Sequence, residues 1–263
     1  MDQSLQTLQT MGDALSQSLV LEGFPVGVKM LAQDSDLDQV QYKGRPVRRL
    51  SKRLVICQLV ALARYYGTVI GGTAPELSVC RLGATSLGFP VEDCVGVYTD
   101  TYFKGQAAAR KMIDTTPKFA VGRYRAMLVG PLGKLPLEPD VVVVHGNVAQ
   151  LLRIINGYLY DKGGRMEFSV SGDAGLCADT IVLPMLSHRP HLAIPCNGGR
   201  LLSMPSLTDL ACGIPFDLLP GILEGIAYTG KNVPIMYPPA WQHINWELKD
   251  DAPVKAFLER GSA

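Results

Sequence analysis

Apolar residues near the N-terminus recur at the spacing of one helix face. This period predicts an amphipathic helix that ends before Gly23. Its apolar positions are Leu5, Leu8, Met11, Leu15 and Leu19. The next apolar run, FPVGVKML, is short and carries Pro25 at its start, so it predicts a strand. A second helix is expected from Val55 to Tyr66, with Cys57 in its first turn.

The middle of the chain holds the clearest strand signals. RAMLVGPL and DVVVVHG are short, rich in Val and Leu, and bounded by Gly130, Pro131 and Gly146, a pattern typical of buried strands. After the second strand, Asn147 is placed to cap a helix through VAQLLRIINGYLY. Gln150 stands at the position from which it can reach back to that cap.

Three later segments complete the expected order. HLAIPC predicts a strand that leads into an NGGR turn. Ser206 together with Asp209 marks a helix start, and Asp217 is expected to cap a further helix in LLPGILEGIAY despite its proline. GGTAPEL is interpreted as a turn that leads into a helix near Pro75.

Helices that cover strands, without a strict repeat of one strand and one helix, predict an α+β fold with a mixed sheet. A turn, a cysteine and an apolar helix occur together in ELSVCRLGATSLG and again in GDAGLCADTIVLP, so two similar halves are a further expectation. The chain is expected to form a single compact domain over residues 1–263. If it subdivides, the loop KLPLEPD at residues 134–140 is the expected boundary.

Charge and composition narrow the choice of partners. Hydrophobic residues make up 47% of the 263 positions, charged residues 19%, and the net charge is +1, so nothing favours a nucleic-acid partner. The exception is the basic run RPVRRLSKR, from Arg45 to Arg53, which is either a solvated helix entrance or an anion-binding rim.

The apolar stretches, such as Val141 to Val144, are far shorter than the ~20 residues that cross a bilayer, so no membrane partner is expected. The N-terminus lacks a basic region followed by a continuous apolar core, which argues against a secretory signal. We therefore expect a cytoplasmic protein in which the six cysteines stay reduced rather than forming disulfides.

The cysteines carry the sharpest chemical hypothesis. Cys57, Cys80, Cys177 and Cys196 lie in stretches of turn residues and helix starts, where ligands are commonly bound. If the fold brings them together, their thiolates can ligate an iron–sulfur cluster, or zinc as the alternative. No C-x-x-C pair is present, so spacing alone also permits buried, structural thiols. Cys94 and Cys212 have the surroundings of core cysteines.

Two residues are candidates for a general base. His145 ends a predicted strand beside Gly146, and Asp179 follows Cys177 closely.

The candidate substrate-binding segment is the turn that contains Asn197, Gly198, Gly199 and Arg200. Its glycines allow a close backbone approach, and its arginine adds a fixed positive charge for a carboxylate or phosphate. A tight turn that simply needs glycine explains the segment equally well. Neither a Walker A loop nor a G-x-G-x-x-G turn is present.

An ordered set of motifs resembles a known family. CQLVALA, CRLGATSLGF, PDVVVVHGNVAQLLRII, GLCADTIVLP and LAIPCNGGR follow one another as they do in a bacterial and archaeal family catalogued as a domain of unknown function, DUF169. The resemblance runs from FPVGVKML to about Ile222. It implies that the motif cysteines Cys57, Cys80, Cys177 and Cys196 act as a set. It implies no particular activity.

Three kinds of function stay open. The favoured one is an iron–sulfur protein that acts on a small anionic organic substrate as a lyase or reductase. The second is a cofactor-free enzyme with one activated cysteine, helped by His145 or Asp179. The third is a non-catalytic protein that binds a small anion, or a subunit of a larger enzyme.

The aromatic C-terminal stretch from Val233 to Trp246 concentrates both tryptophans and several prolines. Such a segment either covers the core of its own domain or anchors an interface, because aromatic side chains bury large areas at low entropic cost. We expect an assembly, with a homodimer as the default and a larger complex as the alternative.

Overall fold

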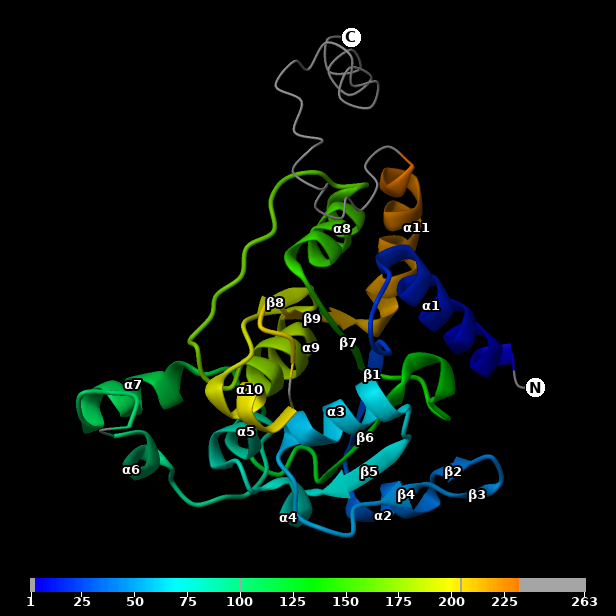
Figure 1. Ribbon diagram of the computed structural model, residues 1–263. Coiled ribbons are helices and arrows are strands. Elements are labelled where there is room, and N and C mark those ends of the chain that lie inside the picture. Colours follow the sequence, from blue (N-terminus) through cyan, green and yellow to red (C-terminus); the bar gives the residue numbers. More distant parts are fainter. Residues whose placement is uncertain (1–2, 100, 204, 232–263) are drawn as a thin grey trace, which may run out of the picture.

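A mixed sheet runs through the computed structural model, which describes residues 3–99, 101–203 and 205–231 (Figure 1). Within these residues the sheet has seven strands, and all neighbours are antiparallel except β4 and β5. In spatial order the strands are β4 (Arg48–Arg49), β5 (Ile70–Thr73), β6 (Ala126–Pro131), β1 (Val26–Leu31), β7 (Val141–Gly146), β9 (Leu210–Pro215) and β8 (His191–Ala193). A separate ladder pairs β2 (Gln41–Tyr42) with β3 (Arg45–Pro46).

Helices cover both faces of the sheet, and this explains the uninterrupted valines of β7. Val141 and Val143 pack into the core on one face, while Val142 and Val144 pack into the core on the other. A strand that is buried on both faces needs apolar residues at every position rather than at alternate ones.

The first face is covered by the helices that begin at the motif cysteines and by the helices that flank them. They are α3 (Ile56–Tyr66), α4 (Ala74–Leu77), α5 (Arg81–Ser86), α6 (Val95–Tyr98), α7 (Gln106–Thr115), the π-helix η2 (Gly175–Val182), α9 (Leu183–Ser187) and α10 (Asn197–Ser203), which packs against α3. The opposite face is covered by α1 (Gln3–Leu19), α2 (Asp34–Gln39), η1 (Leu132–Lys134), α8 (Val148–Leu159), η3 (Phe216–Leu218) and α11 (Leu219–Gly230). None of the helices in the described residues is both long and apolar enough to span a bilayer.

The expected α+β class is confirmed, and so are several elements. The opening helix, the FPVGVKML strand, both valine-rich strands and the helix that carries Cys57 are present. The cap of α8 forms in both directions. The backbone N–H of Gln150 donates to the Asn147 side-chain oxygen at 3.0 Å, and the backbone N–H of Asn147 donates to the Gln150 side-chain oxygen at 2.8 Å.

Four local expectations are wrong. GGTAPEL begins as the buried strand β5 rather than a turn, because its glycines let Leu37, Leu50 and Leu77 pack directly on the backbone. The expected helix near Pro75 is present as α4. The NGGR segment is the first part of helix α10. Ser206 and Asp209 precede strand β9 rather than a helix, because the Asp209 N–H donates to the Ser206 carbonyl at 3.1 Å and closes a single turn. The Asp209 carboxylate forms a buried ion pair with Arg64.

The fourth is Asp217, which does not cap α11. It lies within η3, and Leu218 occupies the cap position without a side-chain hydrogen bond. The Asp217 carboxylate contacts the His188 ring at 3.0 Å instead.

From the centre outward, the two sides of the sheet have the same connectivity. One side runs β1, β6, β5, and the other runs β7, β9, β8. The Leu132 N–H donates to the Pro25 carbonyl just before β1, and the Phe216 N–H donates to the Asp140 carbonyl just before β7. The loop at residues 134–140 joins strands of this one sheet. Two similar halves stay a prediction, which this strand order supports.

Candidate functional site

The four motif cysteines all lie at the beginnings of helices. Cys57 is the second residue of α3, and Cys177 is the third residue of η2. Cys80 is the cap residue of α5, and Cys196 directly precedes α10. The first backbone N–H groups of a helix have no partner within the helix, so these positions present donors to a thiol or thiolate.

Two of the cysteines cap their own helices in the same way. The Gly83 N–H donates to Sγ of Cys80 at 3.5 Å, and the Gly199 N–H donates to Sγ of Cys196 at 3.4 Å. Both sites share the spacing Cys-x-x-Gly, which appears once in each half of the chain. Sulfur is a weak acceptor when neutral, and hydrogen bonds of this kind strengthen when the acceptor is charged. The repeated Cys-x-x-Gly is the local signal that sequence reasoning did not use.

Glycines let the cysteine segments come close to one another. A β-carbon at Gly83 would lie 3.0 Å from Sγ of Cys177 and 3.5 Å from Sγ of Cys80, so both sulfur atoms border the same point of α5. A β-carbon at Gly175 would lie 2.3 Å from the Ile194 carbonyl oxygen. Glycine at that position allows the start of η2, and with it Cys177, to lie against the chain that leads into Cys196.

The electrostatics couple all four thiols. Burial raises the pKa of Cys57 to about 12, with further increases from Cys196 and Cys80. Burial also raises the pKa of Cys177, and Cys80, Cys196 and Cys57 add to that shift. The pKa of Cys80 is raised by burial first, and Cys196 contributes as well. Every pair within the set therefore interacts, because a charge on one sulfur disfavours a charge on each of the others. The predicted convergence of the four motif cysteines has this support.

Three residues that sequence reasoning left out adjoin the set. The Tyr98 side chain hydrogen-bonds with Cys80, and burial raises the pKa of Tyr98, followed by smaller effects of Cys80, Cys94, Asp173 and Cys177. Tyr98 thus lies among the thiols, with the buried Asp173 nearby. Burial raises the pKa of Cys94, with a smaller contribution from Cys80, and Cys94 in turn adds to the raised pKa of Tyr98. No local pattern marks any of these three residues.

Cys212 is a core cysteine, as its surroundings in the sequence indicate. It is buried in the core on the opposite face of the sheet, and burial alone raises its pKa to about 12.

Within residues 3–99, 101–203 and 205–231, no three His, Cys, Asp or Glu side chains already stand in an arrangement that holds a metal ion. The four motif thiols affect one another's pKa values, but their sulfur atoms do not stand at the distances of a site for a single metal ion.

The structure does not bring His145 to the cysteines. Burial lowers its pKa to about 3, with a further contribution from Arg64 near the C-terminal end of α3, whereas Cys57 lies at the other end of that helix. Nδ1 of His145 is buried and has no hydrogen-bond partner among the described residues. Arg64 forms a buried ion pair with Asp209 at 2.7 Å. A histidine with so low a pKa is a poor general base at neutral pH.

Asp179 lies two residues after Cys177 on η2 but takes no part in the coupling. Burial alone raises its pKa to about 7, and no cysteine contributes. Its Oδ2 is buried and lacks a hydrogen-bond partner within the described part of the chain. A carboxyl group with a pKa near 7 has the proton affinity of a general acid or base, but the structure gives it no contact with the thiols.

The NGGR segment is helical, so its backbone does not form the expected open anion-binding turn. The Gly199 N–H is used by Cys196 Sγ, and the Arg200 N–H donates to the Cys196 carbonyl at 2.8 Å. Asn197 and Gly198 are exposed, and Arg200 is half-buried. The predicted interface segment, Val233–Trp246, lies outside the described residues.

Comparison with known proteins agrees with the motif pattern. The chain is similar to the uncharacterized protein MJ0308 of Methanocaldococcus jannaschii, with 29% identity over 178 residues that cover 65% of this chain and 76% of that protein. No solved structure matches the chain. The model of the family DUF169, described as "Uncharacterised ArCR", matches residues 14–225, which include all four motif cysteines. The chain therefore belongs to the DUF169 family.

Proposed function

We propose that Cys57, Cys80, Cys177 and Cys196 hold an iron–sulfur cluster, and that the chain uses it to act on a small anionic organic substrate as a lyase or reductase. Zinc at the same cysteines is the alternative. The observation that carries the proposal is the placement of the four cysteines at four helix starts, with the sulfur atoms of Cys80 and Cys177 both beside Gly83. The mutual effects of the four thiols on their pKa values agree with this placement. A bound cluster would supply either redox chemistry or a Lewis acid.

The charge balance of the site favours a metal centre. In the absence of a cation, burial and mutual repulsion keep Cys57, Cys80 and Cys177 protonated. A bound metal reverses this, because its positive charge makes each coordinating thiol a thiolate and offsets the repulsion among the sulfurs. An arrangement that is costly for free thiolates is thus well suited to a cation.

The same shifts weigh against the cofactor-free alternative. A nucleophilic cysteine needs a lowered pKa, usually from a nearby cation or histidine. Here the pKa values of Cys57, Cys80 and Cys177 are all raised, and neither His145 nor Asp179 is coupled to them. An activated thiol at these three positions has no supporting contact.

Hydrogen bonds and exposure suit a cluster that reacts. The backbone of Gly83 and Gly199 and the side chain of Tyr98 donate to the sulfur atoms, and such bonds set the reduction potential of a cluster. Cys57 and Cys177 are buried, whereas Cys80 and Cys196 are half-buried, so the site has an open side. Catalytic metal sites keep an accessible position, while structural sites are closed.

The test is metal analysis of the full-length chain purified without oxygen. We expect a brown protein with iron and acid-labile sulfide, whose visible absorption bleaches on reduction. Cys177→Ser should lose the colour and the iron. Cys212→Ser is the matched control, because Cys212 is equally buried but lies on the opposite face of the sheet.

The other outcomes distinguish the iron–sulfur cluster from zinc, from a chain without a metal and from a general loss of stability. Stoichiometric zinc without iron, lost in Cys177→Ser and kept in Cys212→Ser, would assign the zinc alternative. A colourless chain that takes up neither metal after anaerobic incubation with iron, sulfide and zinc would contradict a metal centre. Equal loss of iron in both variants would show that the effect is general destabilisation.

A further inference from the structure

A pocket of about 580 Å³ lies beside the segments that carry Cys57 and Cys80. Its volume is in the range of small-molecule binding sites. Arg53 precedes α3, Ser78 follows α4, and Arg81 directly follows Cys80. The lining residues are Arg53, Ala74, Pro75, Ser78, Arg81, Pro90, Val91 and Glu92.

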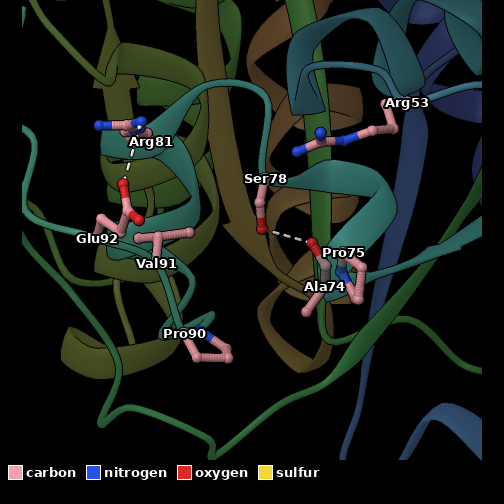
Figure 2. A pocket seen from close by; sticks show the side chains of 8 residues that line it. All are labelled: Arg53, Ala74, Pro75, Ser78, Arg81, Pro90, Val91 and Glu92. Carbon is pink, nitrogen blue, oxygen red and sulfur yellow. Dashed lines mark hydrogen bonds and ion pairs between the residues drawn. The ribbon is translucent and has the colours of Figure 1, made fainter.

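Four polar side chains line this pocket: two arginines, one serine and one acid, Glu92. Figure 2 shows Arg53 and Arg81 on opposite sides of Ser78. The Ser78 hydroxyl donates to the Ala74 carbonyl, so it has no proton left for a ligand. The two guanidinium groups are then the donors for an anion. A guanidinium forms two parallel hydrogen bonds with a carboxylate, which gives both charge and geometry.

Arg53 is free to take a ligand. Among the described residues its side chain forms no hydrogen bond or ion pair, although its neighbour in the basic run, Arg49, pairs with Asp38 and Glu76. Within the described part of the chain, the Arg81 side chain has one ion-pair partner, the exposed Glu92 at 3.3 Å, and such a pair is weak in water. An incoming carboxylate at Arg81 would compete with that exposed partner rather than with a buried one.

The remaining walls are apolar. Ala74 and Pro75 lie on the side of Arg53, and Pro90 and Val91 lie on the side of Arg81 (Figure 2). A ligand that contains only an anionic group would leave these surfaces in water. A carboxylate with an attached hydrocarbon chain matches both the cationic and the apolar parts.

We infer that this pocket binds an aliphatic organic acid, with its carboxylate between Arg53 and Arg81 and its carbon chain along Pro75, Pro90 and Val91. That this acid is the substrate rests on the proposed function, because the same chain segments supply the cysteine site. The pocket itself does not require a metal.

The test is titration calorimetry of the full-length chain with hexanoate, acetate and inorganic phosphate as probes. Hexanoate should bind at least about tenfold more tightly than acetate, because only hexanoate buries several methylene groups. Arg53→Gln should weaken hexanoate binding about tenfold, as expected for the loss of a charge-assisted hydrogen bond. Lys52→Gln is the matched control, since Lys52 is exposed next to Arg53 but does not line the pocket.

A further variant should change the affinity for hexanoate in the opposite direction. Glu92→Gln should tighten hexanoate binding about twofold to threefold, because it removes the negative charge that competes for Arg81. A role of these residues in folding alone would not produce a gain. Thermal unfolding of Arg53→Gln should match that of the unchanged chain, since the exposed arginine has no ion-pair partner to lose among the residues that the structure describes.

The inference is overturned if hexanoate shows no binding at about 10 mM. It is also overturned if Arg53→Gln binds as well as Lys52→Gln, or if phosphate and acetate bind as tightly as hexanoate. Repeating the titration with Cys177→Ser separates the two proposals. Hexanoate binding that Cys177→Ser retains after it has lost its iron would show that the pocket does not depend on the cluster. An unchanged chain that binds hexanoate but takes up no metal would leave the pocket standing and contradict the cluster. A metal-loaded chain that ignores hexanoate would do the reverse.

Discussion

Gly83 lies directly against Cys177. A β-carbon at Gly83 would stand 3.0 Å from the Cys177 sulfur and 3.2 Å from Cδ1 of Ile56, both tighter than ordinary contacts. Gly83 also supplies the N–H that donates to Cys80. One small residue therefore keeps two of the coupled sulfur atoms next to the same turn of α5.

The first prediction concerns Gly83→Ala. Alanine favours a helix by about 1 kcal/mol, but overpacking costs about 1–3 kcal/mol, so we expect a net loss of stability of about 1 kcal/mol in urea unfolding. The variant should also bind less iron. Gly221→Ala is the control, because Gly221 lies in α11 with open space around it, and it should be neutral or stabilising. A gain at Gly83 equal to that at Gly221 would contradict the close packing.

Tyr98→Phe tests the hydrogen bond to Cys80. A donor to a ligand sulfur stabilises the more negative, reduced state of a cluster, so its removal should lower the reduction potential while iron remains bound. Tyr102→Phe is the control, because the Tyr102 ring packs on Tyr98 at a centroid distance of 5.7 Å but its side chain is largely exposed. Redox titration monitored by visible absorption gives both potentials. Identical shifts in the two variants would remove the special role of Tyr98.

Asp209→Ala should be strongly destabilising. The Arg64–Asp209 pair is buried on both sides, and removal of one partner leaves a buried, unpaired charge that costs about 3–5 kcal/mol. Asp38→Ala removes one of the two carboxylate partners of Arg49, in an exposed pair, and should cost less than about 1 kcal/mol. Urea unfolding at neutral pH measures both. Similar losses for the two variants would show that the buried pair is not a special contributor.

The buried His145 predicts a pH dependence of stability. Its pKa is lowered from 6.5 to about 3 in the folded chain, so between these values the unfolded chain binds a proton that the folded chain excludes. The contribution of His145 is complete above pH 6.5 and falls by up to about 1.4 kcal/mol per pH unit as the pH decreases toward 3. His145→Gln should unfold with a shallower slope in this window and an unchanged slope above it. An unchanged slope below pH 6.5 would contradict the burial of a neutral imidazole.

Short-range patterns in the sequence were enough to predict the helices and strands that depend mainly on neighbouring residues. The period of apolar residues identified α1, and the Asn147–Gln150 pair identified the start of α8, because a helix cap involves residues three apart. The valines of β7 indicated a short, buried strand. The order of the cysteine motifs also singled out the residues that the fold couples. By itself, the sequence determined these segments and the candidate thiols.

Only the tertiary structure decided which of these residues are neighbours. It placed Cys57 close enough to Cys196 for one thiol to raise the pKa of the other, and it placed Tyr98 beside Cys80. It also placed His145 near the end of α3 that is opposite to Cys57. It also turned the glycines of β5 into packing surfaces, where a turn had been expected. These relationships depend on sheet order and on close approaches between segments far apart in the chain. No local pattern of residues encodes them, because their energy comes from burial and electrostatics that exist only after the segments have packed.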